Sequence, residues 1–347
     1  MLKIGVKLGG LVESKKLSIA NLSGRTIAFD GNNVLYQFLS IIRGPTGEPL
    51  KDREGHITSH LSGIIYRNSN LMEAGIKIVY VFDGRPHQFK SKVLKSRNEV
   101  RSQAKIKYEK AVKEGKTEEA KRYGQRSIVA TTDLISDAKR LLTLMGIPWI
   151  QAPGEGEAQS SHLTIKGDVW GAASQDFDSL LFGSSRLIRN LSITGRRKLP
   201  RKNVYIKVEP EIIELEGYLK ELELTREQLI DVALLVGTDY NPKGIRGIGP
   251  KTAIKLIRKH ENIEAAIPYI KNPVFPHPLE EMRDLFMKPR VTDSYELNWK
   301  RPDRPGILTF LCGERGFGRA RVIKAIEKID SGFKKTKERV TLERWFG

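Results

Sequence analysis

Short apolar runs alternate with amphipathic segments through the first half of the chain. Runs with the length of strands lie at residues 25–29, 76–82, 147–150 and 169–173. The run at 76–82 is almost continuously apolar, which is typical of a parallel strand buried on both faces. A segment with helical spacing follows each run, and this alternation predicts a mostly parallel α/β sheet flanked by helices.

The rest of the pattern predicts the connecting elements. Helices are expected at 8–12, 31–42, 58–74, 132–145, 211–222 and 225–236, a strand at 187–191, and a basic hairpin at 192–207. Residues 261–330 are expected to form short helices broken by Pro-rich loops, and the polar stretch 331–339 is expected to be a linker. Residues 85–126 are rich in Lys and Arg, and their apolar positions are too sparse for a core-facing stripe. We therefore expect helices there that project from the domain.

Carboxylates follow all of these strands. Single carboxylates follow the first two strands, and pairs spaced i, i+2 follow the other two: Asp30, Asp83, Glu155 with Glu157, and Asp176 with Asp178. Because the carboxyl ends of parallel strands share one edge of a sheet, these side chains should converge. Asp239, in the turn after helix 225–236, could reach the same edge. Such a concentration of negative charge requires a cation.

Helix capping is the structural alternative for Asp30 and Asp176, since a capping carboxylate stabilises a helix by about 1 kcal/mol. Capping explains neither the i, i+2 partners nor the shared placement. A site made only of oxygen ligands suits Mg²⁺ or Mn²⁺ rather than Zn²⁺. The number of carboxylates exceeds the needs of one ion, so two ions are expected, an arrangement that serves in-line displacement at phosphodiesters.

The charge of the chain points to a polyanionic partner. The 347 residues carry a formal net charge of +19, which favours nucleic acid, the alternative being a basic surface that binds nothing. Cys312 is the single cysteine, so no internal disulfide can form, and a reducing compartment is expected. No apolar run is long enough to span a membrane, and no signal peptide is evident, so we expect a soluble intracellular protein. A basic protein with a metal-filled acidic crevice is best explained as a nuclease.

A second motif, GIRGIGPKTA, begins at Gly244. Its glycines predict a tight hairpin, and Pro250 suits the first position of a helix. The amides around Gly247 and Gly249, with Lys251 and Lys255 on the following helix, could hold a phosphate without reading base sequence. The pattern favours a helix–hairpin–helix DNA-binding element over a tight turn that binds nothing.

From Gly5 to Phe346 the chain resembles the XPG/flap endonuclease family of structure-specific 5′ nucleases, and most closely its archaeal members. The motifs VYVFDG, GIPWIQAPGEGEAQ, SQDFDSLLFG and GTDYNPKGIRGIGPKTA carry the resemblance in the family's order. It implies a PIN-like (resolvase-like) fold with a helical arch and a helix-two-turn-helix region. The expected boundaries are a first nuclease part with the start of the arch (1–103), the rest of the arch (104–127), an internal nuclease part (128–260, with the helix–hairpin–helix at 239–260), a C-terminal helical part (261–330), and a linker with tail (331–347).

The resemblance also assigns roles to single residues. One Mg²⁺ would take Asp30, Asp83, Glu155 and Glu157, and the other Asp176, Asp178 and Asp239, with Mn²⁺ able to substitute. Asp30, Asp83, Lys90 and Arg97 would be catalytic, the last two as arch cations at the scissile phosphate, and Tyr36 and Glu155 would contact DNA. The alternatives are a solvated charged face for the two cations and a core aromatic for Tyr36. K⁺ would bind the backbone carbonyls of Gly244, Ile245 and Ile248.

The end of the chain resembles the family's sliding-clamp motif at Arg339, Leu342, Trp345 and Phe346, although Arg339 stands where Gln is usual. The alternative is a tail that packs on its own domain. A second departure is the extension Met-Leu-Lys-Ile before Gly5, where the family begins Met-Gly.

The implied activity is Mg²⁺-dependent cleavage near the single-strand/double-strand junction of 5′ flaps, with 5′–3′ exonuclease activity, in Okazaki-fragment maturation and DNA repair. The implied partners are branched DNA with a 5′ flap or nick and the sliding clamp (PCNA), without a membrane. A cytoplasmic monomer is expected, or a nuclear one in a eukaryotic source. Alternatives are a bubble-cutting or junction-resolving sibling, a non-catalytic junction binder, and a phosphatase with an aspartyl nucleophile.

Overall fold

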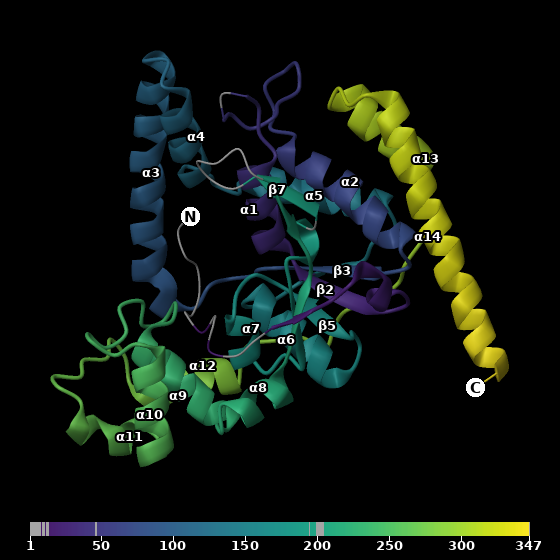
Figure 1. Cartoon of the computed structure of the whole chain (residues 1–347). Helices are drawn as coiled ribbons and strands as arrows, with labels where there is room; N and C mark the ends of the chain where they lie inside the picture. Colours follow the sequence, from purple (N-terminus) through teal and green to yellow (C-terminus); the bar gives the residue numbers. More distant parts are fainter. Residues whose placement is uncertain are drawn as a thin grey trace.

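The computed structural model describes residues 8, 11, 14–45, 47–193, 195–198 and 205–346, without the side chains at 193, 195–198, 205–207 and 337–346. Its centre is a seven-stranded sheet (Figure 1). In spatial order the strands are β1 (Lys15–Lys16), β9 (Glu211–Glu214), β6 (Arg186–Arg189), β5 (Gly171–Ala173), β2 (Thr26–Asp30), β3 (Lys77–Phe82) and β4 (Trp149–Gln151). The strands from β6 to β4 are mutually parallel, while β9 pairs antiparallel with both of its neighbours, β6 and β1. The predicted mostly parallel α/β sheet is confirmed.

Alternating side chains of the central strands enter two different cores. Ile27 and Phe29 of β2, with Tyr80 of β3, face a core formed with helices on one side of the sheet. That side is covered by α1 (Gly31–Ile41), α2 (Ser59–Glu73) and α5 (Thr132–Leu144), with α14 (Arg319–Phe346) packed outside α2 (Figure 1). Ala28 and Val79 face the opposite side, which is covered in part by α6 (Gly156–Lys166). The buried central strands thus follow the period-two rule.

The second face of the sheet is completed by a segment from far along the chain. Residues 288–303, which we call the strap, have no helix or strand. Tyr295, Leu297 and Trp299 of the strap pack against the core that contains Val79. The Trp299 indole Nε1 donates a hydrogen bond to the Ile78 carbonyl oxygen at 2.8 Å. The strap therefore replaces a helix as cover for this face.

A third core, which we call the helical core, packs on Leu187 of β6 and Ile213 of β9 and is otherwise built mainly from helices. Its helices are α7 (Asp178–Leu181), α8 (Leu215–Glu221), α9 (Arg226–Val236), α10 (Pro250–His260), α11 (Ile263–Ala266) and α12 (Leu279–Met287). The remaining short elements are η1 (Ile19–Leu22), η2 (Gln88–Lys90), η3 (Leu191–Ile193), η4 (Ile267–Tyr269), α13 (Arg304–Ile307) and η5 (Leu308–Glu314). The predicted basic hairpin is present as β7 (Gly195–Lys198) paired with β8 (Tyr205–Val208).

The basic stretch predicted to project does so. It forms α3 (Ser91–Lys113) and α4 (Thr117–Arg126), two helices that pack together along one side of the molecule (Figure 1). We call this pair the arch hairpin. Helix α3 buries only Val93, Ala104 and Ala111 over its length. Its sparse apolar positions thus contact the partner helix and the base of the arch hairpin rather than a wide core.

Two predicted elements are wrong. The helix expected at 211–222 begins only at Leu215, because residues 211–214 form β9 at the sheet. Both isoleucines of β9 are buried, and Arg189 of β6 pairs with Glu211 directly across the ladder, at 3.6 Å. The linker expected at 331–339 is part of helix α14, because this stretch packs along α2, where a Cβ at Gly332 would lie only 2.0 Å from the Met72 carbonyl oxygen. The helix expected at 8–12 lies largely outside the described residues.

No helix in the described part of the chain is both long and apolar enough to cross a bilayer.

Candidate metal centre and DNA interface

The predicted carboxylates meet at one edge of the sheet. Strands β5, β2, β3 and β4 are consecutive neighbours, and the acidic turns follow their carboxyl ends. Asp30 is the last residue of β2, and Asp176 lies between β5 and α7. Glu155 precedes the first turn of α6, which contains Glu157. The fold therefore brings together residues from distant parts of the sequence, as the strand pattern predicted.

Three of these carboxylates form a compact ligand set. Glu157, Asp176 and Asp178 each offer an oxygen, and these oxygens lie within 4.8 Å of one another. The Ser174 hydroxyl donates to Glu157 Oε1 at 2.6 Å, which fixes one carboxylate oxygen and leaves the other available. An all-oxygen set of this kind fits a hard divalent cation such as Mg²⁺ or Mn²⁺.

Burial and mutual repulsion disfavour the charged carboxylates. Burial, with the Asp83 charge, raises the pKa of Asp30 to about 8. Burial, with the Asp239 charge, raises the pKa of Asp176 to about 6. Both side chains are less than a tenth exposed. A bound cation would relieve both costs, so the electrostatics agree with the ligand chemistry.

Asp30 and Asp83 are oriented by backbone amides. Asp30 Oδ1 accepts a hydrogen bond from the Asn33 amide at 3.0 Å, so Asp30 also caps α1. Asp83 Oδ1 accepts from the Gly156 amide at 2.6 Å. A Cβ at Gly156 would lie 3.0 Å from that oxygen, so the close approach favours glycine. Capping and ligation are compatible roles for Asp30, because one oxygen remains for each.

Two cations from the base of the arch hairpin reach the same cluster. Lys90 Nζ lies 2.7 Å from Glu155 Oε2 and 3.2 Å from Asp239 Oδ2, and an Arg97 nitrogen lies 2.5 Å from Asp239 Oδ1. Burial raises the pKa of Asp239, but Lys90 and Arg97 outweigh burial and hold it below its usual value. Burial lowers the pKa of Lys90, but the two carboxylates raise it above normal, so the ammonium stays charged. The geometry excludes a purely solvated face for Lys90 and Arg97.

Sequence reasoning missed Tyr240 and Ser174. The Tyr240 hydroxyl donates to Glu155 Oε1, and Lys90 Nζ lies 5.2 Å from the centre of the Tyr240 ring. Burial, and the charge of Glu155, raise the pKa of Tyr240, so the hydroxyl remains a donor. The signal for each was its place beside a predicted ligand, since Tyr240 follows Asp239 and Ser174 precedes Asp176 by two residues.

Tyr36 occupies an intermediate position between core and surface. It lies on α1 and is partly exposed, and the guanidinium of Arg101 from α3 lies 5.0 Å from its ring centre. The ring is therefore not a plain core aromatic, and it faces the arch hairpin. Base stacking by Tyr36 stays a prediction.

The predicted helix–hairpin–helix consists of α9, the turn 237–249 and α10. Gly249 is the N-cap residue of α10, Pro250 is its first residue, and a Cβ at Gly247 or Gly249 would meet no atom within 4 Å. Lys251 and Lys255 are exposed on the same helix. The amides at this helix start are thus accessible to a phosphate.

Gly244 differs from the glycines at the start of α10. Its φ is +55°, and a Cβ there would lie 2.3 Å from the Val236 carbonyl oxygen. The Ile245 carbonyl accepts a hydrogen bond from the Ile248 amide at 3.1 Å. These contacts define the tight turn in which K⁺ ligation by Gly244, Ile245 and Ile248 stays a prediction.

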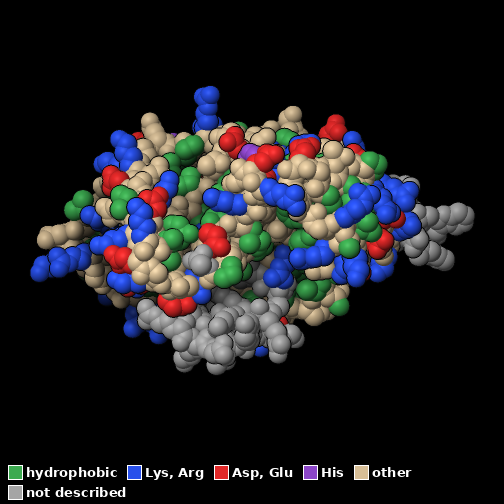
Figure 2. Space-filling model, turned by 90° about the horizontal axis from the view of Figure 1, so that it is seen from above, with side chains coloured by type: hydrophobic (Ala, Val, Ile, Leu, Met, Phe, Trp, Pro, Cys, Tyr) green, Lys and Arg blue, Asp and Glu red, His purple; other side chains and the backbone are tan. Residues whose placement is uncertain are grey.

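The predicted clamp-binding residues Arg339, Leu342, Trp345 and Phe346 lie on the last turns of α14, and their side chains are outside the described part. Lys and Arg side chains are spread over the face seen in Figure 2, as the net charge predicts.

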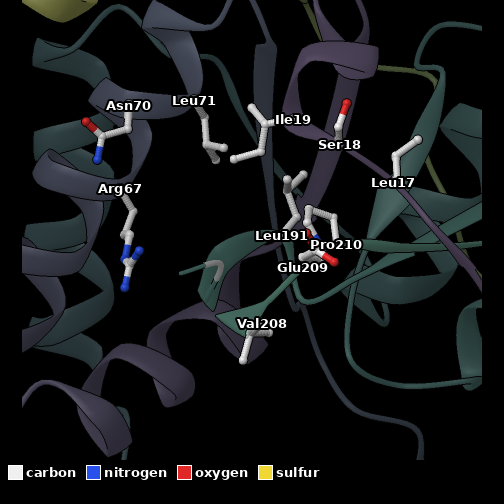
Figure 3. Close-up of a pocket in the computed structure, with 10 residues that line it drawn as sticks. All are labelled: Leu17, Ser18, Ile19, Arg67, Asn70, Leu71, Leu191, Val208, Glu209 and Pro210. Carbon is white, nitrogen blue, oxygen red and sulfur yellow. The ribbon is translucent and has the colours of Figure 1, made fainter. Parts of the chain in front are cut away.

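A cavity of about 410 Å³, lined by Leu17, Arg67, Leu191 and Pro210 among others, lies between α2 and the ends of β1 and β8 (Figure 3). None of its lining residues belongs to the acidic cluster or to the helix–hairpin–helix.

Known proteins share both the sequence and the fold. The XPG N-terminal domain matches residues 7–104, and the XPG I-region matches residues 146–239. A flap endonuclease 1 from Pyrococcus furiosus is 52% identical over 343 residues, which cover 99% of each chain. The chain belongs to the flap endonuclease 1 family. Its relatives are flap endonucleases.

Solved structures agree with membership of the flap endonuclease 1 family. The flap endonuclease-1 from Methanococcus jannaschii has a TM-score of 0.76 and 40% identity, covering 95% of this chain and 99% of that one. The catalytic core of Rad2 in complex with DNA substrate has a TM-score of 0.66 and 25% identity, covering 91% of this chain and 96% of that one. The PIN-like nuclease fold is confirmed.

Proposed function

We propose that this flap endonuclease family member hydrolyses phosphodiesters near the junction of 5′-flap DNA, and degrades 5′ ends at nicks, during Okazaki-fragment maturation and DNA repair. The observation that carries the proposal is the acidic cluster at the sheet edge with Lys90 and Arg97 placed directly over it. Family membership supports the reaction class, and the contacts of these side chains support the roles proposed below for single residues.

Two Mg²⁺ ions, replaceable by Mn²⁺, are the proposed cofactors. The proposed ligands are Asp30, Asp83, Glu155 and Glu157 for one ion and Asp176, Asp178 and Asp239 for the other. When bound, the ions supply an activated water and neutralise charge on the attacking and leaving oxygens. Lys90 and Arg97 would move from their carboxylate partners to the scissile phosphate and stabilise the developing negative charge.

The DNA would be held at several points around this centre. The exposed amides at Gly247 and Gly249, with Lys251 and Lys255, would hold a phosphate of the duplex, helped by K⁺ at the Gly244 turn. Tyr36 would stack on a base near the scissile bond, on the side that faces the arch hairpin. Glu155 would contribute both to the metal site and to the DNA contact.

The end of α14 is proposed to bind a sliding clamp. Leu342, Trp345 and Phe346 would form an apolar plug for a pocket on the clamp, and Arg339 would weaken the contact that Gln usually makes. The enzyme itself is proposed to be a monomer.

The test uses an end-labelled 5′-flap duplex with and without Mg²⁺, beside single-stranded and fully paired controls. We expect a metal-dependent cut near the flap junction that is absent in Asp176→Ala, while Asp176→Ala still binds the DNA. Tight binding without cutting by the wild type would favour a junction-binding protein instead. Near-normal cleavage by Asp176→Ala would refute the metal assignment.

A further inference from the structure

The ring of Phe89, the residue directly before Lys90, lies between two histidines. The His277 imidazole is parallel to it, with ring centres 3.6 Å apart and 6° between the planes. The His87 ring meets it edge-on at 4.6 Å and 85°. His277 comes from the loop before α12, far from Phe89 in the sequence. The aromatic pair therefore joins the base of the arch hairpin to the helical core.

The turn that carries Lys90 is held by contacts of His87 and Phe89 in addition to the ion pairs of Lys90 itself. It is the short element η2, and its N-cap residue His87 accepts a hydrogen bond at Nδ1 from the Phe89 amide at 3.4 Å. Phe89 is the member of η2 that packs on the helical core. His87 also lies edge-on to Tyr240, with 6.5 Å between ring centres, and Tyr240 packs on Phe286 of α12 at 5.2 Å. The position of η2 thus depends on contacts with α12 and the loop before it.

Lys90 is the side chain whose placement requires this anchoring. Its side chain is 13% exposed, and its ammonium lies within 3.2 Å of both Glu155 and Asp239. A lysine has a flexible four-carbon stem, so the direction of its ammonium is set by the backbone that carries it and by its surroundings. A shift of η2 by about 1 Å would misplace the ammonium, and displacements of this size can cost large factors in rate.

We propose that the stacking of His277 on Phe89 positions Lys90 over the acidic cluster, and that His277 is a positioning residue for the cleavage reaction. We call this contact the Phe89–His277 stack. The inference rests on the proposed function, because it requires that Lys90 acts at the scissile phosphate. The Phe89–His277 stack holds η2 through His277, which belongs to a part of the chain that contributes no ligand to the cluster. Stacked aromatic pairs contribute enough energy to change the population of a local arrangement by about threefold to tenfold.

The test compares His277→Ala with His277→Phe, which restores a flat ring for stacking without an imidazole. Single-turnover cleavage of a 5′-flap duplex is measured with excess enzyme and Mg²⁺, and DNA affinity is measured separately in EDTA. Tyr269→Ala is the matched control, because it removes another stacked pair, His260 with Tyr269 at 4.1 Å, that does not contact η2. We expect His277→Ala to be about threefold to tenfold slower with DNA affinity unchanged within twofold, and His277→Phe and Tyr269→Ala to match the wild type.

A double mutant shows whether His277 acts through Lys90. We expect His277→Ala to cause no further loss of cleavage rate in a Lys90→Ala background, since the Phe89–His277 stack then has no lysine to position. An equal loss of cleavage rate in the wild-type and Lys90→Ala backgrounds would contradict the proposed role of the Phe89–His277 stack. Failure of His277→Phe to restore the rate would contradict it as well. If Lys90→Ala itself cleaves at the wild-type rate, the proposed role of Lys90 fails and the inference falls with it. If Lys90→Ala is slow and His277→Ala is not, the inference alone fails.

Discussion

Replacing Asp176 by Asn should stabilise the metal-free protein while destroying its activity. The residue is 5% exposed, and burial together with the Asp239 charge raises the pKa of its carboxyl group to about 6 from an ordinary 3.8. Asn removes the charge and keeps an oxygen that can accept the hydrogen bond now made by the Asp178 amide to Asp176 Oδ1 at 3.4 Å. The variant therefore relieves repulsion without leaving that amide unpaired.

The size and sign of the effect follow from linkage. Because the folded pKa exceeds the unfolded one, ionised Asp176 destabilises the native state increasingly as pH rises from about 4 through 6. The full cost, at about 1.4 kcal/mol for each pKa unit, is roughly 3 kcal/mol at pH 8, and at pH 5 it is about 1.5 kcal/mol.

The assay is urea unfolding in EDTA at pH 8 and pH 5. We expect Asp176→Asn to have the larger free energy of unfolding at both, with the gain at pH 8 about twice that at pH 5. Glu327→Gln, which removes an exposed carboxylate on α14, is the control and should change stability by less than about 0.5 kcal/mol. Added Mg²⁺ should stabilise the wild type more than the variant. A variant no more stable than the wild type at pH 8 would refute the idea that the cluster is strained by its own charge.

Further predictions concern the arch hairpin, the interior, the hairpin turn and the tail. Lys90→Ala should slow single-turnover cleavage by about tenfold or more at unchanged DNA affinity, and an effect on affinity alone would remove its catalytic role. Burial, with the Arg315 charge, lowers the pKa of His60 to about 3, so the unfolding free energy should fall by about 2 kcal/mol between pH 8 and pH 5; His60→Leu should abolish that part of the pH dependence. Gly244→Ala should cost more than about 2 kcal/mol in urea unfolding, and Gly247→Ala, where a Cβ has open space, about 1 kcal/mol; equal costs would contradict the packing at Val236. Trp345→Ala should weaken binding to a sliding clamp in a pull-down or by calorimetry without changing cleavage of DNA alone, and unchanged clamp binding would remove the tail from that role.

The sequence predicted those features that depend on local periodicity. The strands before Asp30 and Asp176 are short, apolar and followed by helical patterns. Both the strands and the sheet edge that they share could therefore be predicted from the sequence. Strand β9 could not be predicted from the sequence, because residues 211–214 become a strand only when β6 lies beside them and Glu211 can pair with Arg189. The continuation of α14 through 331–339 was missed because a polar, basic composition suits a linker as well as an exposed helix.

The residues of the candidate site also divide into those that the sequence pattern predicted and those that it did not. The carboxylates at the sheet edge were found from spacing, whereas Lys90 and Arg97 were selected only by family resemblance, since an isolated basic helix gives no reason to prefer them. The Tyr240 contact with Glu155 and the stack of His277 on Phe89 join residues whose proximity is created by tertiary packing. No pattern within a single stretch of sequence carries that information.

The strap has a consequence for how the chain folds. One face of a sheet built largely from the first half of the sequence is closed by Tyr295, Leu297 and Trp299, so part of the core around Val79 stays uncovered until residues near 299 are available. Contacts of such long sequence separation are formed late and make folding slow. During synthesis the nascent chain would therefore expose this apolar face until residues 288–303 have left the ribosome, and apolar surface exposed in this way is prone to aggregation.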